Sequence, residues 1–96
     1  MSDPQITHRL EGSKGQYVLS QNGAEAVLTY SKLGEHQVIA DHTEVPETLS
    51  GTGAGLKLVE RLVSDARAQG FRIVPLCPFV NAMRRKHPEW ADAFNV

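Results

Sequence analysis

The stretch Ser50–Lys57, with the sequence SGTGAGLK, most constrains the fold, because it joins a strand-like run to an amphipathic helix. Glycine stands at alternate positions 51, 53 and 55, so the backbone can turn sharply and approach a ligand with no Cβ in the way. The first N–H groups of the helix that follows have no partner inside it, and they carry the positive end of its dipole. The pattern therefore predicts an anion site, suited to phosphate, in a strand–turn–helix unit.

The half of the chain before this turn has the alternating pattern of strands. The Asn22-Gly23 pair is a strong hairpin signal, since both residues tolerate positive φ. Pro46 lacks a backbone donor, so strand pairing should stop there and expose backbone groups that a ligand could use. The predicted strands cover residues 5–11, 16–21, 24–31 and 36–45.

Alternation assigns the residues of the fourth predicted strand to two faces. One face is predicted to carry Val38, Ala40, His42 and Glu44, and the other Ile39, Asp41, Thr43 and Val45.

The second half predicts a helix over residues 54–69, ended by Gly70, and then a strand over residues 71–76. A strand–helix–strand crossover should place this last strand parallel to the one ending at Val45. Pro78 and Pro88 can each open a further helix, the second one packing through Trp90 and Phe94. The fold class is therefore α+β. The predicted apolar stripe of the long helix is Leu56, Val59, Leu62, Val63 and Ala66.

Length and charge indicate an ordinary globular protein in which residues 1–96 form one domain. A net charge of −1 gives no overall attraction to nucleic acid or membrane, and no partner of either kind is expected. The single cysteine, Cys77, excludes an internal disulfide. The polar N-terminus, residues 1–4, lacks a signal-peptide core, so a cytoplasmic protein is expected. The cysteine and the histidines show no metal-ligand spacing, so no metal is predicted.

Three sequence motifs together resemble the small, single-domain GCN5-related N-acetyltransferase-like (GNAT-like) proteins, which are predicted acetyltransferases. The motifs are HTEV at residues 42–45, the glycine turn, and CPFV at 77–80 followed by HPE at 87–89. The resemblance implies a minimal GNAT-like fold. It also implies that acetyl-CoA binds where the fourth and fifth strands splay apart, and that its acetyl group moves to an amine.

The resemblance also implies which residues hold the coenzyme. The pantetheine arm would pair with the fourth strand near Val45, and the pyrophosphate would lie on the glycine turn. The family's turn motif, R/Q-x-x-G-x-G/A, reads SGTGAG here, so Ser50 replaces the Arg or Gln and predicts weaker coenzyme binding. Lys57 and the run at residues 84–86 could assist the outer phosphates. The predicted coenzyme residues are Val45, Gly51, Thr52, Gly53, Ala54, Gly55, Leu56 and Lys57.

Acetyl transfer needs a base for the amine, a donor for the oxyanion and a proton for the leaving thiolate. His42 and Glu44 are the candidate bases, and the resemblance implies that a backbone N–H near Val45 polarises the carbonyl. The family's usual acid is a tyrosine in the helix after the fifth strand, whereas both tyrosines here, Tyr17 and Tyr30, come far earlier.

Cys77 is the alternative, because the resemblance places it where the coenzyme thiol should arrive. It could accept the acetyl group, protonate the leaving thiolate or form a mixed disulfide with coenzyme A, with His87 as a partner. The sequence thus predicts an N-acetyltransferase. The alternative function is a non-catalytic coenzyme A or acyl-CoA binding module, linked to redox chemistry through Cys77. The acceptor cleft would be open or completed by a partner, for example a second copy in a homodimer.

Overall fold

The computed structural model describes residues 5–95. The polar residues 1–4, from which we predict that a signal peptide is absent, lie outside the described residues. The chain forms one five-stranded sheet in the order β1-β2-β3-β4-β5. The first four strands are antiparallel and β5 runs parallel to β4. The strands are β1 (Gln5–Glu11), β2 (Lys14–Gln21), β3 (Ala24–Lys32), β4 (Gln37–Glu44) and β5 (Arg72–Val74).

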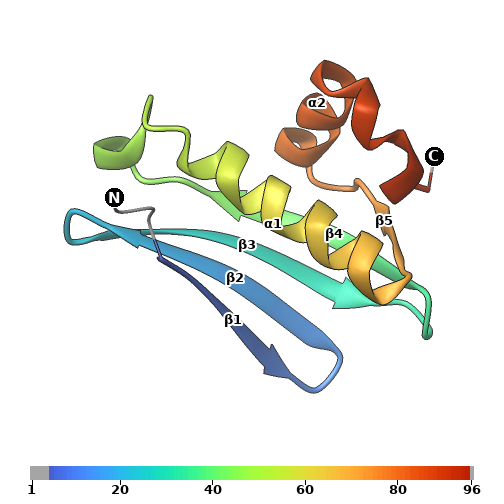
Figure 1. The fold of residues 1–96 in the computed structure, drawn as a ribbon. Coiled ribbons are helices and arrows are strands. Elements are labelled where there is room, and N and C mark those ends of the chain that lie inside the picture. The colour runs from blue at the N-terminus through green and yellow to red at the C-terminus, as the bar shows by residue number, and fades with distance from the viewer. Residues whose placement is uncertain (1–4, 96) are drawn as a thin grey trace.

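The helices are α1 (Ala54–Gln69) and α2 (Pro78–Lys86), with short 3-10 turns η1 (Glu47–Leu49) and η2 (Pro88–Ala93). The helices come after β4 in the chain, with α1 between β4 and β5 and α2 after β5, as the sequence predicted. Gly70 ends α1 in the left-handed conformation, with φ of 80°. Figure 1 shows α1 crossing one face of the antiparallel strands, with α2 beside β5. The α+β prediction is confirmed.

One hydrophobic core lies between α1 and the sheet. Alternate residues of β2 and β3 point toward the helix, and Tyr17, Leu19, Ala26 and Leu28 are fully buried there. The predicted stripe of α1 needs one correction. Leu58 is fully buried and belongs to the stripe, whereas Leu56 is only half-buried at the first turn of the helix, where its side chain lies toward the rim of the core.

The other side of the sheet, called here the open face, has no helix over β1–β3 among the described residues (Figure 1). Its cross-strand rows follow from the register, since directly paired residues share a face. Only Val18 at its centre is fully shielded. From β1, β2 and β3 the open face carries Thr7, Arg9, Glu11, Lys14, Gln16, Val18, Val27, Thr29 and Ser31.

Two tyrosines on the α1 side of the sheet make side-chain hydrogen bonds, one to α1 and one to β1. The Tyr17 hydroxyl donates to Asp65 Oδ2 at 2.7 Å, and the Tyr30 hydroxyl is hydrogen-bonded to His8 Nε2 at 2.6 Å. The His8 ring stacks on Tyr17 with 4.3 Å between ring centroids. Burial, together with the bond to Asp65, raises the pKa of Tyr17, and burial lowers the pKa of His8. Tyr17 thus remains a hydroxyl donor and links β2 to α1, while His8 of β1 packs on Tyr17 within the sheet.

Candidate functional site

A gap opens between β4 and β5 because they pair over only three residues. The register runs from Gln37↔Arg72 to Ile39↔Val74. Pro75 follows, and the chain turns so that the Cys77 N–H donates to the Ala40 carbonyl at 2.8 Å. Beyond that bond, β4 from Asp41 to Glu44 has no strand beside it on the β5 side among the residues described. The half-buried Val45 continues this free edge.

A β-bulge at Asp41 decides which way the candidate bases point. Thr29 pairs with His42 and Tyr30 with Ala40, so Asp41 is an extra residue on β4. The prediction that Val38, Ala40, His42 and Glu44 share one face is therefore wrong. Val38 and Ala40 are buried on the α1 side, whereas His42 and Glu44 are exposed on the open face.

The bulge also brings the half-buried Thr43 and the buried Cys77 together on the α1 side of the gap, called here the covered side. Thr43 pairs with the core residue Leu28 and so faces α1. The Cys77 thiol, which is 4% exposed, donates to Thr43 Oγ1 at 3.4 Å. Cys77 and the two candidate bases thus lie on opposite faces of β4.

The glycine turn has the backbone conformation that its sequence suggested. Gly51 and Gly53 have φ of 82° and 83°, a left-handed region that favours glycine, and a Cβ at either position would meet open space. Gly53 caps α1 without any side-chain hydrogen bond. The first helical bond runs from the Lys57 N–H to the Gly53 carbonyl at 3.0 Å. The N–H groups of Ala54, Gly55 and Leu56 thus lack helical partners and suit an anion.

Thr52 and Gly55 have structural tasks that the motif alone does not reveal. The Thr52 hydroxyl and N–H both donate to the Leu49 carbonyl, at 2.6 and 3.2 Å, so they hold the turn closed. A Cβ on Gly55 would lie 2.5 Å from the Phe79 ring. The absence of a Cβ at Gly55 therefore lets α2 pack close to α1. The Gly55 N–H remains one of the unpaired donors at the start of α1.

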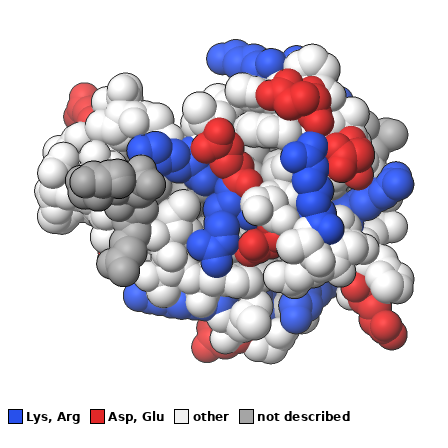
Figure 2. Space-filling model, in the orientation of Figure 1, with Lys and Arg blue, Asp and Glu red and all other residues white. Residues whose placement is uncertain are grey.

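The basic residues considered for the outer phosphates differ in their contacts. Lys57 is half-buried in the first turn of α1. Arg84 donates to Asn81 Oδ1 through Nε and Nη2, at 3.1 and 2.9 Å, whereas Arg85 and Lys86 are exposed at the end of α2. Figure 2 shows basic and acidic side chains interleaved on the face it presents, so there is no broad field of one sign there.

The His87 side chain contacts two residues of η2. Its ring stacks on Trp90 with 4.2 Å between centroids, and its Nδ1 lies 3.0 Å from Glu89 Oε2. The hydrogen-bond partner of Cys77 is Thr43 rather than His87. Sequence reasoning missed Thr43, whose only signal was its place in the HTEV motif, because its orientation depends on the bulge.

The arrangement of a splayed strand pair beside an uncapped helix start suits a coenzyme that has an extended arm and a pyrophosphate. These elements define the acyl-CoA-dependent acyltransferases that the sequence resembles. No metal-binding group occurs among residues 5–95, and no helix of that part of the chain is long and apolar enough to cross a membrane.

Comparison with known proteins agrees with this class. The model of the GCN5-related N-acetyl-transferase family matches residues 16–93, and the chain belongs to this family. It is similar to the NMR solution structure of a GCN5-like protein from Staphylococcus aureus, with 29% identity and a TM-score of 0.72. That alignment covers 99% of this chain and 91% of the other. No curated protein matches the chain.

Proposed function

We propose that the chain transfers the acetyl group of acetyl-CoA to an amine. The observation that carries the proposal is the free edge of β4, residues 41–45, which leads to the uncapped start of α1. The pantetheine arm would hydrogen-bond to this edge, as a strand would. The pyrophosphate would accept hydrogen bonds from the N–H groups of Ala54, Gly55 and Leu56. Ser50 supplies no cationic group, so these backbone donors would make most of the contacts with the pyrophosphate.

In this proposal the base and the acid of the reaction lie on opposite faces of β4. The amine approaches on the open face, where His42 or Glu44 takes its proton. The N–C bond forms, and the thioester C–S bond breaks. On the covered face the Cys77 thiol gives its proton to the leaving thiolate and regains one from solvent. A backbone N–H near Val45 stabilises the oxyanion.

The opposite placement favours one of the roles considered for Cys77. A thiol on the side away from the amine is suited to protonating the leaving group. It is less suited to acting with His42 as a nucleophile–base pair, because that pair needs a hydrogen bond of about 3 Å. The non-catalytic binding module with a redox-linked Cys77 gains no support from the family comparison.

An amide NMR titration with acetyl-CoA and, separately, with CoA tests coenzyme binding. Shifts are expected at residues 45–57 and 73–80. Gly53→Val should abolish them, because a β-branched residue cannot hold a φ of 83° without strain that disturbs the turn. Gly34→Val is the matched control, since Gly34 also has positive φ (74°) and open space around it but lies in the β3–β4 turn. Equal binding by both variants would contradict the proposal.

Turnover of acetyl-CoA with an amine acceptor tests the assigned roles. His42→Ala or Glu44→Gln should lower the rate by about 10²–10⁴-fold if that residue is the base. Cys77→Ser should lower the rate with coenzyme binding intact, because the hydroxyl is a poorer acid than the thiol. Unchanged rates in all three variants would remove the catalytic assignments and leave a coenzyme-binding module.

A further inference from the structure

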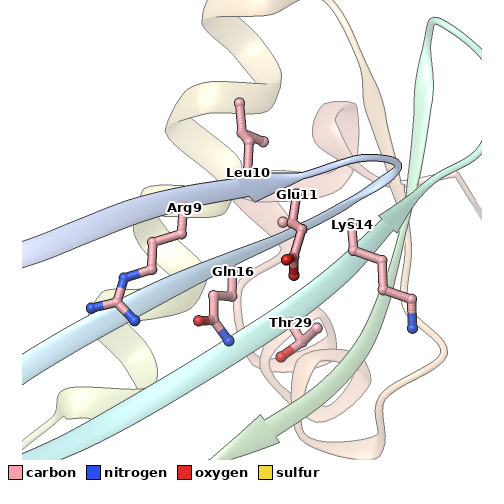
Figure 3. Close-up of a pocket in the computed structure, with 7 residues that line it drawn as sticks. Arg9, Leu10, Glu11, Lys14, Gln16 and Thr29 are labelled. Carbon is pink, nitrogen blue, oxygen red and sulfur yellow. The ribbon is translucent and has the colours of Figure 1, made fainter.

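We infer that the acceptor binds in a polar trough on the open face, and that it is a short peptide with a free amine and a free carboxylate. This inference rests on the proposed function, because it supplies the acceptor of that reaction. The trough is a cavity of about 480 Å³ at the β1–β2 end of the open face. Figure 3 shows Arg9, Glu11, Lys14, Gln16 and Thr29 on one side of the sheet there, and Leu10 on the other.

The register connects this trough to the gap. Arg9 pairs with Gln16, Gln16 with Thr29, and Thr29 with His42. These four residues form one cross-strand row from β1 to β4. The two central residues, Gln16 and Thr29, are neutral and polar. The last residue, His42, is a candidate base beside the free edge of β4. A ligand lying along the row would thus place one end at the acetyl group.

The covered side of the gap leaves no comparable path. Cys77 is 4% exposed, and Val80 of α2 is fully buried beside the same core. Phe79 packs against the start of α1. The helices therefore shield the gap on that side, and an amine must reach the acetyl carbon from the side of His42.

The charges at the two ends of the row have opposite signs. Arg9 and Lys14 stand at the β1–β2 end with Glu11 between them, which leaves a net positive charge there. Within residues 5–95, neither cation has a carboxylate within ion-pair distance. At the other end, Glu44 is exposed, and Asp41 accepts one hydrogen bond from Ser31 at 2.6 Å.

The polarity and the length of the row together define the ligand class. An ammonium group fits the end with Asp41 and Glu44, and a carboxylate fits the end with Arg9. Three strand spacings separate the backbones of Arg9 and His42, about 14 Å. An extended peptide rises about 3.3–3.6 Å per residue, so about four residues span the row.

Peptide titrations followed by amide NMR test the inference without relying on turnover. The probes are tetraglycine, its C-terminal amide and N-acetyl-tetraglycine. Tetraglycine should shift amides along the row of Arg9, Gln16, Thr29 and His42. The amide should bind about two- to fivefold more weakly, the range of one exposed ion pair. The acetylated peptide should also bind more weakly, because it lacks the ammonium group.

Arg9→Gln should remove the preference for the free carboxylate. Lys32→Gln is the matched control, since Lys32 is an exposed cation of β3 on the opposite face. The Lys32→Gln variant should still bind tetraglycine more tightly than its C-terminal amide. Equal binding of the free acid and the amide by the native chain would overturn the inference, as would shifts away from the row. No shift at about 10 mM peptide would also overturn it.

An acetyl-CoA titration of the same sample separates the two proposals. Acetyl-CoA shifts at residues 45–57 without peptide shifts on the open face would leave the proposed function standing and refute the trough. The absence of any coenzyme response would refute the proposed function itself. The peptide titration would in that case still decide whether the trough binds a zwitterionic peptide.

Discussion

Gly55→Ala tests whether Gly55 serves the contact between the two helices. The new Cβ would lie 2.5 Å from one Phe79 ring atom and 3.0 Å from a second, inside normal contact distance. Overpacking of this kind costs about 1–3 kcal/mol. Replacing a helical glycine with alanine contributes about 0.5–1 kcal/mol in the opposite direction. The net effect should be a loss of about 0–2.5 kcal/mol in the free energy of unfolding.

The sign of this effect should change when the ring is removed. In a Phe79→Ala background only the helix-propensity term is left, so Gly55→Ala should stabilise by about 0.5–1 kcal/mol. Urea unfolding of the four proteins in this double-mutant cycle gives a coupling energy of about 1–3 kcal/mol. The midpoints are comparable only if the slope of unfolding free energy against urea concentration is the same in all four.

Gly53→Ala provides the control for this cycle. Gly53 has a φ of 83° and open space around it, so alanine there costs about 1–2 kcal/mol through backbone strain alone. That cost should be the same with and without Phe79. If Gly55→Ala also has the same effect in both backgrounds, the packing explanation of Gly55 is refuted. The position would then be explained by its backbone alone.

Two further predictions concern Tyr17, which bonds to α1, and His8, which stacks on Tyr17. Tyr17→Phe removes the donor to Asp65 and should lower the free energy of unfolding by about 0.5–1.5 kcal/mol in urea titrations; no change would mean that the bond contributes nothing. The lowered pKa of His8 means that the unfolded chain binds its proton more tightly, so stability should be full above the unfolded pKa of 6.5 and fall as the pH drops below it. Urea midpoints at about pH 7.5 and 5.5 check this, and His8→Gln should reduce the pH dependence; an equal dependence in that variant would assign it to other groups.

Much of the fold was predictable because its signals are local. The Asn22-Gly23 turn adopts positive φ at both residues, and α1 has the predicted bounds, residues 54–69. The match of the GNAT-like prediction to the family model and to a solved structure confirms the fold and the family. The assignments of the coenzyme and catalytic residues, the extent of the domain over residues 1–96 and the cytoplasmic location stay predictions.

The site was less predictable because its geometry depends on contacts distant in sequence. Strict alternation placed His42 beside Ala40 on one face, and a single extra residue at Asp41 reverses that relation. Neither glycine nor proline, the usual sequence markers of a bulge, occurs in residues 37–44. The last strand ends at Val74 rather than at residue 76, because the chain turns at Pro75 to bond Cys77 to Ala40.

The sequence by itself determined the glycine turn, the order of strands and helices, and the crossover that makes β5 parallel to β4. Each follows from backbone preferences or from periodicity within a few residues. Only the tertiary structure decided that His42 and Cys77 lie on opposite faces, that Thr43 accepts a hydrogen bond from the Cys77 thiol, and that Phe79 packs on Gly55. These relations arise where strands and helices far apart in the chain pack together, and packing there depends on shape that local preferences do not encode.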